Sequence, residues 1–290
     1  MNPITRNILT DPRIVKSVRA AASCLPRPVE KWLQFEYCIL KYTKQFIDAG
    51  YRIEHTSKGF RISGHGMNIA GPSAQAVHIA KEVWIDGIYD FRMGDAPLTV
   101  IDIGFNTGTT GIWHAVDPMV KEIYAYEPFP TTFEWAMRNI ESNARAKSKI
   151  KAFRYGLSDR NIPELILPYD KDLMGNQSSI TERQIDNFGH RQDYEIIEVR
   201  RASEVLGPIF KACKNKIAMK IDCEGAEREI LPDLAAADLL KFVTAIIMEY
   251  HDGKFLDLMR TLIENGFETK RTPGFYKDSI GMIRATRRQK

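Results

Sequence analysis

The fold is decided by one stretch, Val100–Gly108, which reads Val-Ile-Asp-Ile-Gly-Phe-Asn-Thr-Gly. Its apolar first half predicts a buried β-strand over residues 99–103, and this strand runs directly into a turn that contains two glycines. A second apolar strand, residues 123–126, follows and stops at Glu127. A strand, a glycine turn and an acidic residue that closes the next strand are the parts of a nucleoside-binding βαβ unit.

The spacing of the glycines distinguishes between nucleoside ligands. A dinucleotide fingerprint reads G-x-G-x-x-G, and its middle glycine makes room for a pyrophosphate. Here Asn106 stands at that position between Gly104 and Gly108, the turn contains no Lys or Arg, and Asp102 would repel a phosphate. The turn therefore favours S-adenosylmethionine, which carries a sulfonium and no phosphate, with Glu127 accepting from its ribose hydroxyls. A dinucleotide, or a glycine turn without a ligand, is the alternative.

The composition is that of a globular protein and excludes several other classes. The chain has 290 residues, a formal net charge of +4, 44% hydrophobic residues and four cysteines without a C-x-x-C pair. No apolar run reaches the length of a membrane span, and the polar N-terminus does not resemble a signal peptide. Basic residues are scattered, so nucleic acid is not expected as a partner. We expect a cytoplasmic protein.

The chain divides into two parts by pattern. Residues 1–95 are expected to form a mostly helical N-terminal extension, with helices over 29–47 and 73–90 and a small hairpin within 51–62. These helices could cover the rest of the molecule or form the face of a homodimer. Residues 96–290 are expected to form the ligand-binding domain.

Strands and helices alternate after residue 96, which implies a mainly parallel sheet with helices on both faces. Two last strands without a helix between them predict an antiparallel end. Seven strands with a reversed last one is the Rossmann-like α/β fold of class I methyltransferases. The expected strands are 99–103, 123–126, 151–155, 217–222, 244–250, 267–272 and 280–286, and the expected helices lie near 108–116, 131–144, 226–240 and 254–266.

An insertion at about 160–215 separates the third and fourth strands. It contains possible strands at 164–167 and 195–199 and a polar loop, Asn176–Ser179. The insertion lies on the carboxyl side of the sheet, where open α/β sheets bind ligands. The hydroxyls and amides of the loop suit a polyol acceptor, and a flexible polar loop without a role is the alternative.

One further motif gives a family resemblance. Lys220–Glu227 reads Lys-Ile-Asp-Cys-Glu-Gly-Ala-Glu and follows the K-x-D-x-E-G-x-E signature of FkbM-type S-adenosylmethionine-dependent methyltransferases, which the chain resembles over about residues 80–286. The glycine turn, Tyr126–Pro128, Gly156–Asp159 and Glu249–His251 also match. Arg201–Leu206 departs from the family pattern T-L-D-x-L-L, because the aspartate of that pattern is absent.

The resemblance implies the reaction and part of the binding site. Members of this family mostly methylate hydroxyl groups on sugars, lipids or secondary metabolites, so a small molecule of that kind is the expected partner. The resemblance further implies that Ser158 and Asp159 contact the adenine. The complete set expected to bind the cofactor is Asp102, Gly104, Asn106, Thr107, Gly108, Glu127, Pro128, Ser158, Asp159 and Asp222.

Four side chains are candidates for the chemistry. Asp222 and Glu224 follow the fourth strand, and Glu249 and His251 end the fifth, two residues apart and so on one face. His251 is the first choice for the general base, because an unperturbed imidazole titrates near neutrality. Either carboxylate could orient it or be the base itself. These residues could also have no catalytic role. His251 could be a histidine that merely ends a strand, and the acidic residues, Glu227 among them, could favour a helix N-terminus.

Several alternatives stay open at this point. The same four groups could bind a divalent cation, but nothing in their spacing requires one, so we expect no metal. Methyl transfer to nitrogen or carbon is a second possibility, and a neutral amine would need less help from a base than an alcohol. A module that binds the cofactor without catalysis is the third possibility.

Overall fold

The computed structural model divides the chain into two compact units, Met1–Gly87 and Ile88–Lys290. The division falls before the boundary expected at residue 95, because the backbone at 88–90 is hydrogen-bonded to Arg284 of the second unit. The residues that the structure describes are 42–56, 59–91, 93–169, 193–274 and 277–288.

The first unit contains a small antiparallel sheet beside helical residues 42–48. Its strands are β1 (Arg52–Thr56), β2 (Gly59–Gly64) and β3 (Met67–Gly71), in that order in the sheet, and α4 (Ala74–Trp84) follows. The expected hairpin is therefore confirmed as the first two strands, β1 and β2, of a three-stranded sheet.

Two expectations for this unit need correction. The third strand was missed because Met67 and Ile69 are its only large apolar residues, too few to give a clear alternation. The helix expected over 73–90 ends at Trp84. Most of the helix expected over 29–47 lies outside the described residues.

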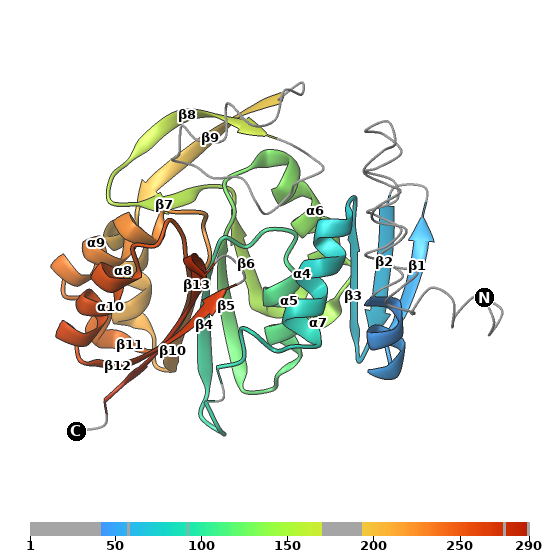
Figure 1. The fold of residues 1–290 in the computed structure, drawn as a ribbon, viewed down its shortest axis with the longest axis horizontal. Coiled ribbons are helices and arrows are strands. Elements are labelled where there is room, and N and C mark those ends of the chain that lie inside the picture. The colour runs from blue at the N-terminus through green and yellow to red at the C-terminus, as the bar shows by residue number, and fades with distance from the viewer. Residues whose placement is uncertain (1–41, 57–58, 92, 170–192, 275–276, 289–290) are drawn as a thin grey trace. The chain divides into compact units, whose positions relative to one another are not determined.

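The second unit is built on a seven-stranded sheet, which confirms the predicted fold class. The strand order is β12-β13-β11-β10-β4-β5-β6, and only β13 is antiparallel to its neighbours (Figure 1). The strands are β4 (Leu98–Ile103), β5 (Val120–Tyr126), β6 (Ile150–Phe153), β10 (Lys216–Ile221), β11 (Val243–Tyr250), β12 (Phe267–Gly274) and β13 (Lys277–Arg287).

Helices cover both faces of this sheet, as the sequence predicts. One face carries α5 (Thr109–Val116), α6 (Pro130–Glu141) and α7 (Ala144–Lys149). The other carries α8 (Ala202–Ala212), α9 (Glu227–Ala236) and α10 (Phe255–Glu264), whose buried side chains form one core with the strands. No helix among the described residues is long and apolar enough to cross a membrane.

The helix α8 was not expected from the sequence, because Gly207 and Pro208 lie inside it. Both residues disfavour a helix interior. Ala202, Leu206 and Phe210 nevertheless recur every four residues and are fully buried or nearly so. Tertiary packing of this apolar stripe therefore outweighs the local propensity.

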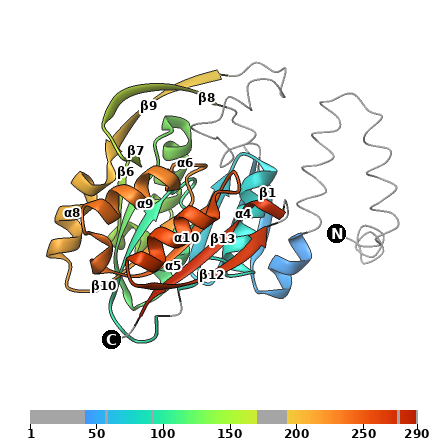
Figure 2. The ribbon, with the colours of Figure 1, turned by 60° about the vertical axis from the view of Figure 1, so that its left-hand side comes forward.

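The insertion forms a second, three-stranded sheet of order β7-β9-β8. Its strands are β7 (Gly156–Ser158), β8 (Ile162–Tyr169) and β9 (Asp193–Arg201), so both strands expected in the insertion are confirmed. Figure 2 shows β8 and β9 as a long pair that extends beyond the main sheet. The polar loop at 176–179 lies outside the described residues.

The buried centre of β11 gives a test of this core. We expect Ile246→Ala to lower the free energy of unfolding by about 2–5 kcal/mol, because Ile246 is fully buried in the sheet. Ile263→Ala is the matched control, since 43% of Ile263 is exposed on α10, and its loss should stay below about 1 kcal/mol. Urea denaturation measures both, and equal losses would contradict this account of the core.

Candidate active site

The second unit contains a cavity of about 300 Å³ at the carboxyl ends of β4, β5 and β10. The second sheet contributes part of its wall, which includes Ile162, Ile197 and Val199. The position agrees with the rule that open α/β sheets bind ligands beyond the carboxyl ends of their strands. Seven of the residues expected in the site line the cavity: Gly104, Asn106, Glu127, Pro128, Ser158, Asp222 and Glu224.

The glycine turn forms one wall, and its backbone explains the sequence. Gly104 has φ of 78°, and a Cβ atom there would lie 1.6 Å from the carbonyl oxygen of Asp222. Asn106 also has a positive φ, 52°, which Asn tolerates better than most residues. The backbone N–H groups of Gly104 and Phe105 donate to the carbonyl of Tyr126, at 3.1 and 2.9 Å. The turn is thus fixed against the end of β5.

Glu127 closes the same wall and is 5% exposed. Its two carboxylate oxygens accept from the backbone N–H groups of Asn106, at 2.8 Å, and Phe129, at 3.0 Å. Burial raises the pKa of Glu127 to about 7, although both hydrogen bonds act in the opposite direction. A carboxylate held in this way keeps lone pairs that can accept from a vicinal diol.

Asp102 lies beneath the turn and does not line the cavity. It is fully buried, and its nearest cation is the ammonium of Lys220, 3.4 Å away. Burial raises the pKa of Asp102 to about 6, and Lys220 opposes the shift. Lys220 also donates to the carbonyl oxygens of Ile103, at 3.3 Å, and Gly104. Asp102 therefore supports the turn through Lys220.

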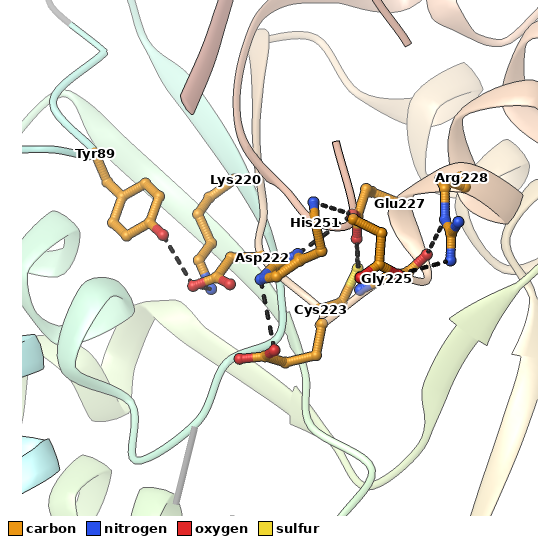
Figure 3. A network of polar contacts seen from close by, with 10 residues as sticks. Tyr89, Lys220, Asp222, Cys223, Gly225, Glu227, Arg228 and His251 are labelled. Carbon is orange, nitrogen blue, oxygen red and sulfur yellow. Dashed lines mark hydrogen bonds and ion pairs between the residues drawn. The ribbon is translucent and has the colours of Figure 1, made fainter. Parts of the chain in front are cut away.

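Asp222 follows β10 and lines the cavity. The hydroxyl of Tyr89 donates to its Oδ2 at 2.8 Å, and the ammonium of Lys220 lies 3.6 Å from the same oxygen (Figure 3). Burial disfavours the charge of Asp222, but Lys220 and His251 outweigh it and lower the pKa of this carboxyl. Asp222 is therefore an anion at neutral pH.

His251 does not line the cavity, but it is paired with Glu224, which does. Its backbone N–H and its Nδ1 contact Oε1 of Glu227 at 2.9 and 3.2 Å, and its Nε2 lies 3.5 Å from Oε2 of Glu224. Burial alone would lower the pKa of His251, but Glu227 and Glu224 raise it to about 10. The imidazole is thus protonated at neutral pH, so to act as the expected base it would first have to lose this proton.

The two remaining acids differ in environment. Burial raises the pKa of Glu224 to about 7, with His251 acting against the shift. Burial and the neighbouring Asp222 carboxylate raise the pKa of Glu249 to about 9, so Glu249 is neutral at pH 7. Glu249 does not line the cavity. Among the four candidates for the chemistry, only Glu224 combines a place in the wall with a pKa near neutrality.

The expected adenine contacts are only partly in the wall. Ser158 lines the cavity and donates to Glu229 and, at 3.2 Å, to Asp159. The Asp159 carboxylate is outside the lining and pairs with Arg160 at 3.2 Å. Arg160 and Glu229 line the cavity instead, and they form an ion pair of 3.5 Å. Thr107 and Gly108 also lie outside the lining and begin the turn into α5.

The segment Arg201–Leu206, which departs from the family pattern, is contacted by an acidic residue of another helix. Oδ2 of Asp233, from α9, accepts from the backbone N–H of Ser203 at 2.7 Å, and its Oδ1 accepts from Nε of Arg201 at 2.7 Å. An acidic group therefore stands at the N-terminus of α8, where negative charge is stabilising, although it comes from another helix.

A metal ion is geometrically possible in one place among the described residues. Asp222, Glu224 and His251 each present a ligand atom, and these atoms lie within 4.8 Å of one another. A protonated imidazole has no free lone pair for a metal, however, and Glu227 holds the other ring nitrogen.

Comparison with known proteins decides the family. The model of the methyltransferase FkbM domain matches residues 102–269, more than half of the chain. The chain belongs to the FkbM methyltransferase family. It is therefore an S-adenosylmethionine-dependent methyltransferase, and the resemblance drawn from the sequence is confirmed.

Two methyltransferases are similar to this chain in sequence, and one solved structure is similar to it in fold. Methyltransferase sdnD of Sordaria araneosa is 24% identical over 237 residues, which cover 73% of this chain and 90% of that protein. Methyltransferase 1 of Beauveria bassiana is 28% identical over 179 residues, covering 57% and 70%. The solved structure of a methyltransferase FkbM from Methylobacillus flagellatus is 13% identical with a TM-score of 0.45. That match covers 94% of this chain, which spans 59% of the length of that protein.

The donor groups around the cavity of this FkbM methyltransferase fit S-adenosylmethionine. The wall presents the anions Asp222 and Glu224 where a cationic ligand gains from negative charge. Arg160 in the wall is paired with Glu229, so it offers little unpaired charge to a phosphate. Gly104 lets the turn pack directly against the backbone carbonyl of Asp222, where a Cβ would collide.

The sequence interpretation missed three functional candidates in this FkbM methyltransferase. Glu227 begins α9, so the expected place at a helix N-terminus is confirmed. It is also fully buried and anchors both His251 and, at 2.8 Å, the backbone N–H of Gly225, which the sequence interpretation missed. Its place in the K-x-D-x-E-G-x-E motif was the available signal. No sequence signal pointed to Glu229, which lies two residues later, and no motif surrounds Tyr89.

Gly104 gives a direct test of the glycine wall. We expect Gly104→Ala to abolish binding of S-adenosylmethionine, because the new Cβ would push the Asp222 backbone out of the wall. Gly94→Ala is the matched control, since Gly94 also has a positive φ, 65°, but no atom lies within 4 Å of its Cβ position. Calorimetric titration compares them, and equal effects would show that backbone strain, not the contact, is responsible.

Proposed function

We propose that this FkbM methyltransferase transfers a methyl group to a hydroxyl oxygen of a small polar acceptor. The acceptor classes that its family resemblance implies are sugars, lipids and secondary metabolites. The observation that carries the proposal is Glu224, a carboxylate in the cavity wall with a pKa of about 7. An alcohol is a weak nucleophile until a base accepts its proton, so transfer to oxygen requires such a group.

Bound S-adenosylmethionine supplies a methyl group on a positively charged sulfur, which is an activated leaving group. We assign Glu127 to the ribose hydroxyls of this ligand and Ser158 to its adenine. The ligand would lie close to the backbone of Gly104 and Asn106. Asp222, kept anionic by Lys220, offers negative charge to the cationic end of the ligand. These residues bind and align, and alignment supplies much of the acceleration in a displacement at carbon.

Glu224 is the general base in this proposal. As the new C–O bond forms and the S–C bond breaks, the proton of the acceptor hydroxyl passes to the Glu224 carboxylate. The other three candidates are less suited: His251 is already protonated, Glu249 is neutral, and Asp222 is a weak base with a lowered pKa. His251 acts through Glu224, whose carboxylate it pairs with at 3.5 Å.

The assignment is tested by Glu224→Gln. We expect a loss of about 10²–10⁴-fold in kcat, the usual contribution of a general base, with nearly unchanged binding of S-adenosylmethionine. Glu198→Gln is the control, because Glu198 is an exposed residue of β9 paired with Arg200 at 2.6 Å. Product analysis by NMR should show an O-methyl group. Full activity of the Glu224 variant, or an N- or C-methyl product, would refute transfer to oxygen through this base.

The pH profile separates Glu224 from His251. The carboxylate is the active form, so kcat/KM should rise with pH through about 7 and then level off. His251→Gln removes a positive charge that lowers the pKa of Glu224, so the midpoint should move to higher pH. If His251 were the base, the same variant would instead lose its activity at every pH.

Metal independence gives a separate test. We expect turnover to survive a strong chelator, because the protonated His251 is not available as a ligand and the proposed base needs no metal. Turnover is measured with and without EDTA, and then with added Mg²⁺. Loss of activity that Mg²⁺ restores would instead assign Asp222, Glu224 and His251 to a metal site.

A further inference from the structure

Tyr89 reaches the active site from a part of the chain that no motif covers. It lies two residues after the boundary between the units and is 3% exposed. Its hydroxyl donates to Oδ2 of Asp222 at 2.8 Å, and its ring lies 5.4 Å from the ammonium of Lys220. Figure 3 shows the hydroxyl directed at the carboxylate. Tyr89 is thus a direct neighbour of a cavity-lining anion.

Arg284 of β13 fixes the backbone on both sides of this tyrosine. Its guanidinium donates to the carbonyl oxygen of Ile88 at 2.5 Å and to that of Asp90 at 2.9 Å. These two carbonyls flank Tyr89 in the sequence, so the arginine restricts the peptide groups that carry its side chain. β13 pairs in turn with β11, the strand that ends at the candidate catalytic residues.

The contact has a chemical consequence for Asp222. A hydroxyl donor stabilises the charged form of a carboxylate and limits its rotation about the Cβ–Cγ bond. Lys220 contributes charge from the same side, since its ammonium is 3.6 Å from the oxygen that Tyr89 contacts. Tyr89 and Lys220 therefore contact the same oxygen of Asp222 and fix the orientation of its carboxylate.

We infer that Tyr89 is a positioning residue that orients the Asp222 carboxylate toward the positive charge of the methyl donor, and that Arg284 holds Tyr89 in place for this task. The inference rests on the proposed function, in which Asp222 faces the cationic end of the ligand. It adds to the binding site a residue from the start of the second unit and one from its last strand.

The first experiment removes only the hydroxyl. We expect Tyr89→Phe to weaken binding of S-adenosylmethionine about tenfold, the size of a lost hydrogen bond to a charged group. Tyr124→Phe is the matched control, because the Tyr124 hydroxyl donates to Glu122 at 3.2 Å and Tyr124 does not line the cavity. The dissociation constant of this variant for S-adenosylmethionine should stay unchanged. Calorimetric titration measures each variant, and unchanged affinity in Tyr89→Phe would overturn the inference.

A double-mutant cycle distinguishes positioning from a general structural effect. If Tyr89 acts through Asp222, its hydroxyl should contribute nothing once the carboxylate is replaced in Asp222→Asn. The double variant should therefore bind S-adenosylmethionine as weakly as Asp222→Asn alone. Additive losses would show that Tyr89 acts elsewhere and would overturn the inference.

Arg284 is tested by a conservative pair. Arg284→Met should weaken binding about as much as Tyr89→Phe, while Arg284→Lys, which keeps one donor for the two carbonyls, should recover part of the loss. Equal affinity of Arg284→Met and the wild type would overturn the role given to Arg284. Wild-type protein that binds no S-adenosylmethionine would refute the proposed function and this inference together. Binding followed by transfer to nitrogen would refute only the proposed reaction.

Discussion

The buried ammonium of Lys220 is the interaction on which the site depends. It is 2% exposed, and it joins the carbonyl oxygens of Ile103 and Gly104 to the carboxylates of Asp102 and Asp222. The first three belong to β4 and the glycine turn, and the last follows β10. Removing one partner from a buried ion pair typically costs about 3–5 kcal/mol, since the other charge is left without compensation. One cation thus ties the geometry of the turn to the charge of the cavity wall.

Around this cation, the acids of the site differ because their surroundings differ. Asp222 is held as an anion by its neighbours, whereas Glu249 keeps its proton beside that anion because two like charges in a buried place cannot both ionise. Glu224 lies between these extremes, balanced by the cationic His251. Environment therefore separates the roles of chemically similar side chains, which is how one pocket can contain a binding anion and a base.

The sequence was sufficient for the seven main strands of the second unit and for the reversed strand, but not for every helix or for the roles of the acids. The main strands were predictable because they are short apolar runs next to glycines or acidic residues, such as the run before Gly104. The α8 helix was not, because its stability comes from packing that overrides Gly207 and Pro208. The role of His251 depends on Glu227 and Glu224, and a pKa shift caused by three-dimensional neighbours leaves no trace in residue spacing. The role of Tyr89 could not be predicted either, because its contact with Asp222 also depends on the three-dimensional fold.

The backbone at Glu224 has an evolutionary consequence. Its φ of 54° lies in the left-handed region, and Gly225 follows at 113°. A non-glycine residue in such a conformation carries a strain of about 1–3 kcal/mol. Glycine at position 224 would relieve that strain and remove the carboxylate. Under the proposed role of Glu224 as the base, selection for heat resistance alone would therefore favour a less active protein, and stability and turnover would oppose each other at this one residue.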